Sequence, residues 1–264
     1  MPVRTPSETL QAAQNNGRAK INLTCNDKPR LLILAVAAGA YIALGAALSI
    51  TVGYGFPGLT AENPSLQRLL SGLAFPIGLT LIVILGGELF TGNNAVLVPG
   101  MLQREFKARH VFVNWTLVWL GNFAGALLFL ALLVYGAGLF DADPWHAAVV
   151  RVAQAKVSMP WHTVLLKGIG ANWCVCLAVW MAAAAHGFGA KAAACWLPVA
   201  AFVILGYEHC IANMFFIPCG MIYGADVTWL QMLGDNLLWS TAGNIIGGAL
   251  FVGALHAWAH GRRN

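Results

Sequence analysis

The sequence predicts an all-α membrane protein with six transmembrane helices, arranged as two inverted three-helix repeats in which the second and fifth helices are broken. The first reason is composition: of 264 residues, 59% are hydrophobic and 9% are charged, whereas soluble domains carry about 25% charged residues. The second is that several apolar runs exceed the roughly 18 residues that indicate a membrane-spanning helix. The third is a polar motif that recurs 120 residues later in the chain.

Six apolar runs define the expected spans. The second and fifth runs are longer than one span requires, and prolines interrupt them, so we expect each of the two to be broken. In order, the runs are 31–53, 67–87 continuing to 102, 111–136, 162–185, 191–221 and 232–258.

Polar stretches outside these runs set the predicted domain limits. The N-terminal segment is expected to be partly helical, with Ser7 as a helix cap and with Leu10, Ala13 and Ile21 as its apolar positions. The predicted limits are 1–30 for the N-terminal segment, 31–258 for one transmembrane domain (repeat one 31–136, repeat two 161–258) and 259–264 for the tail.

The basic residues predict the orientation of the chain in the membrane. Most of them lie in the N-terminal segment, the loop after the second run and the tail, whereas the opposite side holds Arg68, Arg151 and Lys156. Under the positive-inside rule, both termini are then cytoplasmic, as an even number of spans requires. We therefore expect a multi-pass protein of the cell (inner) membrane whose surroundings are the lipid bilayer. Because the basic residues lie between spans and form no stripe, a nucleic-acid partner is not expected.

Two pairs of segments reveal an internal repeat. Residues 86–93 read GGELFTGN and residues 206–213 read GYEHCIAN, while GNFAGALLF at 121–129 matches GNIIGGALF at 243–251. Three spans per repeat place the two repeats in opposite orientations, which is the plan of many transport proteins. Broken helix backbone is tolerated at membrane depth only against protein or a water-filled cavity. The two polar breaks therefore indicate a permeation site near the bilayer midplane.

Polar residues at the two breaks have different expected roles. Glu88 and Glu208 occupy equivalent places, and we expect them to accept hydrogen bonds from backbone N–H groups freed where each half-helix begins. Histidine 209 breaks the symmetry, since its counterpart is Leu89. An ionisable group that the repeat does not duplicate indicates function. Asn122 and Asn244, each in a G-N-x-x-G motif, are expected to bond across closely packed helices.

Four segments together carry a family resemblance: GGELFTGN, GANWCVCLAVWMA, GYEHCIANMFFIP and GNIIGGALF. From residue 31 to 258 the chain resembles the formate/nitrite transporter family. The resemblance implies an aquaporin-like fold and a homopentamer whose protomers each enclose a pore for a small weak-acid anion. Formate is the expected substrate, and nitrite, hydrosulfide, lactate and acetate are the alternatives within the family.

The resemblance also implies which residues line the pathway. It places the central histidine at His209, the threonine of the broken second span at Thr91, and the pore-facing amide at Asn172. The lysine that precedes the fourth span falls on Lys156. The apolar constrictions fall on Phe75, Leu79, Leu89, Phe90, Val175 and Phe202, and the supporting polar groups are Lys156, Glu88, Glu208, Asn93 and Asn213.

The expected chemistry follows from the cost of moving an anion through an apolar constriction. Cations near the mouths can concentrate anions; Lys167, inside the fourth span, either adds to this field or extends its ammonium to the interface. An approaching anion favours the charged form of His209, whereas burial favours its neutral form. We therefore expect passage to be linked to protons, with Thr91 holding the substrate opposite the ring.

Two other classes of function fit the sequence less well. A pore for neutral solutes of the aquaporin type would carry paired Asn-Pro-Ala boxes, which the chain lacks. An intramembrane metalloenzyme would need clustered ligands such as H-E-x-x-H, also absent, and the adjacent side chains of Glu208 and His209 diverge on regular structure. The six cysteines show no zinc-site spacing. We therefore expect a non-enzyme without metal or cofactor.

Overall fold

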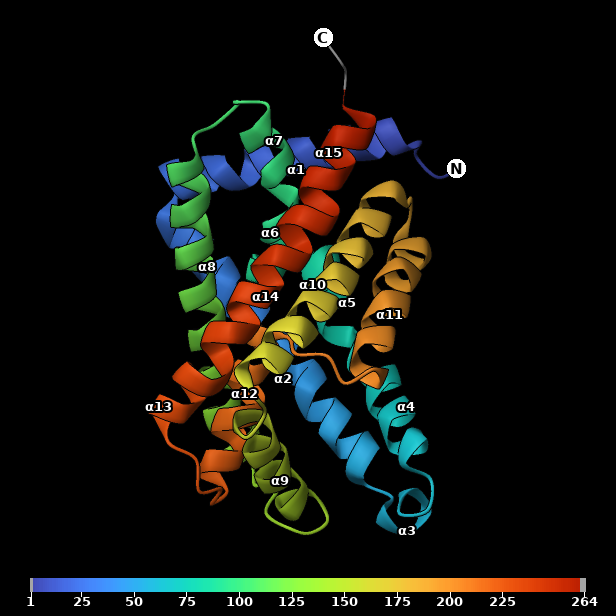
Figure 1. Ribbon diagram of the computed structural model, residues 1–264, viewed down its shortest axis with the longest axis vertical. Helices are drawn as coiled ribbons and strands as arrows, with labels where there is room; N and C mark the ends of the chain where they lie inside the picture. The colour runs from blue at the N-terminus through green and yellow to red at the C-terminus, as the bar shows by residue number, and fades with distance from the viewer. Residues whose placement is uncertain (1, 262–264) are drawn as a thin grey trace.

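The computed structural model describes residues 2–261, and every regular element in that range is a helix. Figure 1 shows a bundle of long helices along one axis, with α1 (Pro6–Asn26) lying across one end beside α7 (Val98–Leu102) and α15 (Leu255–His260). Helices α3 (Pro57–Thr60) and α9 (Trp145–Val157) lie at the opposite end.

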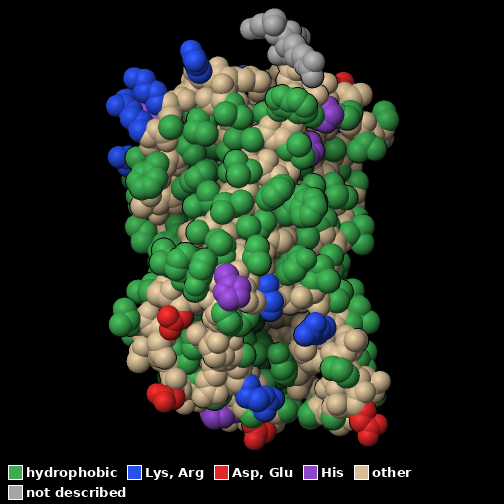
Figure 2. All heavy atoms as spheres, in the orientation of Figure 1, with side chains coloured by type: hydrophobic (Ala, Val, Ile, Leu, Met, Phe, Trp, Pro, Cys, Tyr) green, Lys and Arg blue, Asp and Glu red, His purple; other side chains and the backbone are tan. Residues whose placement is uncertain are grey.

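Five helical segments among residues 2–261 are long and apolar enough to cross a membrane. Hydrophobic side chains cover the middle of the face in Figure 2, and acidic side chains lie near its ends. The five are α2 (Lys28–Tyr54), α4 with α5 (Pro64–Ala74, Ile77–Leu85), α8 with η1 (Ala108–Phe129, Leu130–Tyr135), α10 (Trp161–Ala184), and α13 to α15 (Trp229–Gln231, η2 Met232–Leu237, α14 Leu238–Gly248, η3 Ala249–Ala254, Leu255–His260).

The two runs predicted to be broken are divided as the sequence indicated. The second run continues past α5 into α6 (Phe90–Val96) and α7, and the fifth forms α11 (Phe188–Ile204) and α12 (Cys210–Ile222). The breaks, here called the first elbow (86–89) and the second elbow (206–209), both start at a glycine in the left-handed region, with φ of 79° at Gly86 and 71° at Gly206. Glycine adopts this conformation without the steric cost that a side chain brings.

Close helix pairs hold the elbows in place. Helix α8 packs on α2, and α14 packs on α10, through the glycines of the two G-N-x-x-G motifs. A side chain at Gly125 would overlap the carbonyl oxygen of Val36 in α2, and one at Gly247 would overlap that of Ile169 in α10. The predicted cross-helix bond is confirmed: Asn122 Nδ2 donates to the Ala35 carbonyl at 2.8 Å.

The N-terminal helix is capped two residues before the expected position. Thr5, not Ser7, is the cap of α1, because T-P-S-E places threonine at the N-cap, proline at the first helical position and Glu8 three residues on. The expected apolar positions of α1, Leu10, Ala13 and Ile21, are all buried. At the other end, α15 continues to His260, so the expected tail begins inside a helix; residues 262–264 lie outside the described residues.

Candidate functional site

The start of each half-helix is fixed by an asparagine from a neighbouring helix. Leu89 caps α6 and His209 caps α12, both with extended backbone. Asn122 Oδ1 accepts the N–H of Phe90, and Asn244 Oδ1 accepts the N–H of Cys210, each at 2.9 Å. The amides of α8 and α14 therefore bind these freed backbone groups, the role that the sequence led us to assign to the two glutamates.

The first glutamate is half of a buried ion pair. Glu88 is 3% exposed, and its carboxylate accepts bonds from Lys20 Nζ at 2.8 Å and from Asn93 Nδ2 at 2.9 Å. The expectation that it binds freed backbone N–H groups was wrong. Lys20, which the sequence placed among the cytoplasmic charges, is 9% exposed and joins α1 to the first elbow.

The second elbow repeats this arrangement. Glu208, 4% exposed, binds Lys156 Nζ at 2.9 and 3.1 Å and Asn213 Nδ2 at 2.7 Å. Lys156 lies in α9, which precedes the first span of the second repeat as α1 precedes that of the first. The two lysines therefore occupy equivalent places, although no sequence motif surrounds them.

His209 is placed by two hydrogen bonds. Its Nδ1 accepts the backbone N–H of Ala212 at 3.1 Å, and its Nε2 lies 2.9 Å from Thr91 Oγ1 of α6. Because Nδ1 is occupied as an acceptor, a neutral ring carries its proton on Nε2 and donates it to Thr91. The threonine hydroxyl then keeps its own proton for another acceptor. One contact therefore joins the two half-helices.

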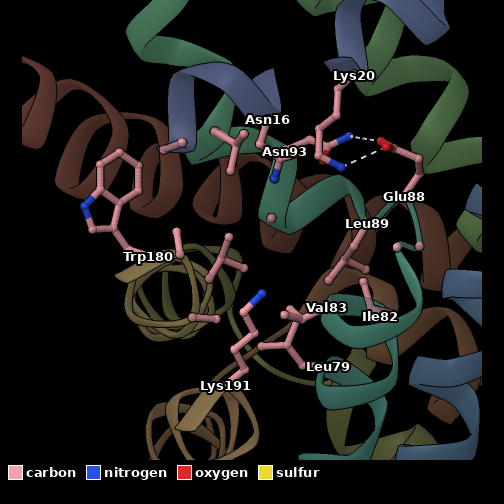
Figure 3. A pocket seen from close by; sticks show the side chains of 18 residues that line it. Asn16, Lys20, Leu79, Ile82, Val83, Glu88, Leu89, Asn93, Trp180 and Lys191 are labelled. Atoms are coloured by element: carbon pink, nitrogen blue, oxygen red, sulfur yellow. Dashed lines mark hydrogen bonds and ion pairs between the residues drawn. The ribbon is translucent and has the colours of Figure 1, made fainter. Parts of the chain in front are cut away.

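Two cavities approach this contact from opposite ends. The α1 cavity, of about 260 Å³, is lined by α1, by α10 and α11 and by the first elbow, and Figure 3 shows Lys191, Trp180, Leu79 and Leu89 around it. The α9 cavity, of about 200 Å³, is lined by α9, by α4 and by the second elbow, including His209. Their positions make them candidate vestibules of one pathway.

An apolar barrier separates the cavities. Leu79 and Leu89 line the α1 cavity, whereas Phe75 and Phe202 line the α9 cavity. All four are 2–3% exposed, and the two phenylalanine rings meet edge to face at 5.7 Å. Phe75 and Leu79 are four residues apart, so about 6 Å of helix rise separates the two linings. The two linings have no residue in common.

Three of the expected pathway residues lie elsewhere. Phe90 packs edge to face on Trp115 at 6.4 Å and borders a groove on α8, and Val175 is buried in the core without lining either cavity. Asn172 is also fully buried; its Nδ2 lies 3.2 Å from the Thr91 carbonyl and 2.6 Å from that of Asn244. Its amide braces α6 against α10 and α14.

Sequence reasoning missed a second pair of amides. Asn93 Nδ2 also donates to Asn114 Oδ1 at 2.9 Å, and Asn213 Nδ2 to Asn236 Oδ1 at 2.7 Å. The sequence did contain a signal for Asn114 and Asn236, because each stands eight residues before the asparagine of a G-N-x-x-G motif. Extending the repeat comparison toward the N-terminus of those motifs would have found them.

Comparisons with known proteins agree along the length of the chain. The sequence model of the formate/nitrite transporter family matches residues 7–258. The uncharacterized transporter YrhG of Bacillus subtilis is 38% identical over 100% of this chain and 96% of its own. A probable formate transporter of Methanothermobacter thermautotrophicus is 36% identical over 97% of both chains. The nitrite transporter NirC of Escherichia coli is 34% identical over 98% of this chain and 94% of its own.

Solved structures show the same similarity in three dimensions. An FNT family ion channel superposes with a TM-score of 0.86 at 33% identity, covering 96% of this chain and 98% of that one. A pentameric formate channel with formate bound superposes with a TM-score of 0.76 at 30% identity, covering 89% of this chain and 98% of that one.

Proposed function

Because this chain belongs to the formate/nitrite transporter family, which comprises transporters and channels and not enzymes, we propose that it passes formate across a membrane in a proton-linked manner. Formate is favoured by the probable formate transporter above, by the formate channel BtFdhC of Bacillus thuringiensis at 34% identity, and by the formate-bound channel structure. Nitrite is the second candidate, since NirC is also 34% identical. Hydrosulfide, lactate and acetate remain alternatives.

The proposed architecture completes the six spans predicted from the sequence. We propose that α11 and α12 together form the span missing from the five long segments, so that 31–136 and 161–258 are inverted repeats. The shared end of α1 and α15 in Figure 1 fits an even number of crossings. With the distribution of basic residues, this supports cytoplasmic termini in the cell inner membrane. The pentameric neighbour supports a homopentamer.

The contact between Thr91 and His209 carries the proposal, because it is the polar point where the α9 cavity meets the apolar barrier. With Nε2–H donating to the threonine oxygen, the threonine hydroxyl can donate to an oxygen of an arriving anion. If the ring takes up a proton at Nδ1, it can pass its Nε2 proton to Thr91 Oγ1 while the threonine hydroxyl passes its own proton to formate. The ring is then neutral, with its proton on Nδ1, and formic acid crosses uncharged.

This step is coupled to the local fold. A proton on Nδ1 would displace the bond from the N–H of Ala212, so charging the ring removes the cap of α12. The neutral ring with its proton on Nε2 is therefore the resting form in this geometry, and a proton on Nδ1 is needed only during the passage of an anion. Lys156 adds a cation to the same cavity, although Glu208 neutralises it.

Formate uptake into proteoliposomes across a range of pH tests the proposal. His209→Asn keeps a polar side chain but removes the titrating ring, so we expect slower uptake and a flattened pH dependence. Thr91→Val should slow uptake about tenfold or more, while Thr91→Ser, which retains the hydroxyl, should stay near wild type. An unchanged pH profile in the asparagine variant would remove the histidine from the mechanism. Uptake of nitrite in preference to formate would select the second candidate.

A further inference from the structure

The two cavities carry the same balance of charge. Two cations and one carboxylate line each of them: Lys20, Lys191 and Glu88 in the α1 cavity, and Arg68, Lys156 and Glu208 in the α9 cavity. In each cavity one lysine is bound to the carboxylate, at 2.8 and 2.9 Å. One uncompensated cation therefore remains per cavity.

The uncompensated cation of the α1 cavity is Lys191. Its ammonium points from α11 into the cavity in Figure 3, whereas Lys20 points from α1 toward Glu88. Lys191 is half-buried, and among residues 2–261 it has neither an ion-pair nor a hydrogen-bond partner. Because no carboxylate is bound to it, the charge of Lys191 is reduced only by solvent screening, and its field reaches the space that an arriving anion must enter.

Arg68 has the matching role in the α9 cavity. It is exposed, and within the described part of the chain it too lacks an ion-pair or hydrogen-bond partner. Arg68 stands eight residues before Pro76 in the first repeat, and Lys191 stands seven residues before Pro198 in the second. Their helices, α4 and α11, begin at opposite ends of the molecule (Figure 1), so near-equivalent positions supply one cation to each cavity.

We propose that Lys191 and Arg68 are the anion-capturing residues of the α1 and α9 cavities, and that Lys20 and Lys156 instead hold the elbows. The inference rests on the proposed function, because it presumes a monovalent anion as substrate. The field of a paired lysine is largely cancelled by its carboxylate, whereas an unpaired charge that lines a cavity concentrates anions there and raises their rate of arrival.

Formate uptake at several concentrations, with formate supplied on one side, tests this assignment. For Lys191→Gln with formate on the α1 side, we expect the half-saturating concentration to rise about three- to tenfold. This is the effect of one unit charge at about 8 Å with an effective dielectric constant of about 60 to 30. The maximal rate should change little. At about 1 M salt, where the screening length is about 3 Å, the difference should disappear. Arg68→Gln should act likewise from the α9 side.

Control variants distinguish a loss of anion capture from a loss of folded protein. Lys191→Arg keeps the charge and should behave as wild type, and Lys107→Gln, an exposed charge outside both cavities, should leave uptake unchanged. Labelling the exposed Cys25 with an impermeant reagent reports the orientation of the vesicles. If half-saturation is unchanged in Lys191→Gln, insensitive to salt, or shifted equally in Lys107→Gln, the assignment is wrong. Absence of formate uptake by the wild-type protein would instead contradict the proposed function.

Discussion

Removal of Lys20 should reveal how strongly α1 is tied to the first elbow. The lysine side chain is 11% exposed and its partner carboxylate 4% exposed, so water screens the pair weakly. In Lys20→Met, the carboxylate of Glu88 keeps the amide of Asn93 but loses its counter-charge. Breaking a buried pair from one side costs about 3–5 kcal/mol. Because the hydrogen bond from Asn93 is retained, we expect Lys20→Met to lower the free energy of unfolding by an amount near the lower end of this range, about 3 kcal/mol.

The double variant Lys20→Met with Glu88→Gln distinguishes a stranded charge from lost packing. It removes both charges and leaves a side-chain oxygen for the amide of Asn93, so most of the lost stability should return, since apolar replacement of a whole buried pair is often nearly neutral. Unfolding of the purified protein by a denaturing detergent, followed by the loss of helical circular dichroism, measures these differences.

A surface pair provides the control. Arg18 binds Glu105 at 2.6 Å, but its side chain is 49% exposed, so Arg18→Gln should change stability little. Lys156→Met, which breaks the equivalent pair of the second elbow, should cost about as much as Lys20→Met. The reasoning fails if Lys20→Met lowers the stability no more than Arg18→Gln does, or if the double variant is as unstable as Lys20→Met alone.

Two further predictions concern backbone geometry and pH. Gly206→Ala places a side chain at a φ of 71° and should lower stability by about 1 kcal/mol or more in the same unfolding assay, whereas Gly189→Ala, with open space around it, should not. Hydrogen bonds from Thr5 lower the pKa of Glu8 below its ordinary value of 4.5. The capping bond should therefore stabilise the start of α1 fully at any pH above 4.5. This stabilisation should be lost only as the pH falls through the lowered pKa of Glu8. The protection factor at the start of α1, which is the exchange rate relative to that of an unfolded chain at the same pH, should be equal at pH 7 and pH 5 and lower in Glu8→Gln. A lower protection factor already at pH 5 would contradict this.

The elements and the elbows could be predicted because they depend on local and periodic signals. Apolar run length gives the spans, and glycines and prolines at equivalent places give the breaks. The partner of Glu88 could not be predicted, since Lys20 is 68 residues away and lies in a helix without a strong pattern. The parallel between Lys20 and Lys156 emerges only once α1 and α9 are folded against their elbows.

The directions in which the side chains of the short half-helices point could not be predicted from the sequence either. Helix α6 has seven residues, and successive side chains on a helix differ by about 100° in direction. Whether Phe90 or Thr91 faces the other elbow therefore depends on how the elbow is docked, which Asn122 and Asn172 decide through bonds to α6. The family resemblance placed both residues on the pathway, but the structure brings Thr91 to the histidine and turns Phe90 toward α8.

The single helical turn between Phe75 and Leu79 has a consequence for speed. A dry layer this thin is comparable in length with formate. If the chain passes formate as proposed, the solute can touch polar groups ahead of it before it has left those behind. Longer acids fill the layer with more of their own bulk and require more side chains to move at once. A gap opened by rotation of one or two rings would then be enough for turnover without any rearrangement of whole helices, which takes microseconds to milliseconds.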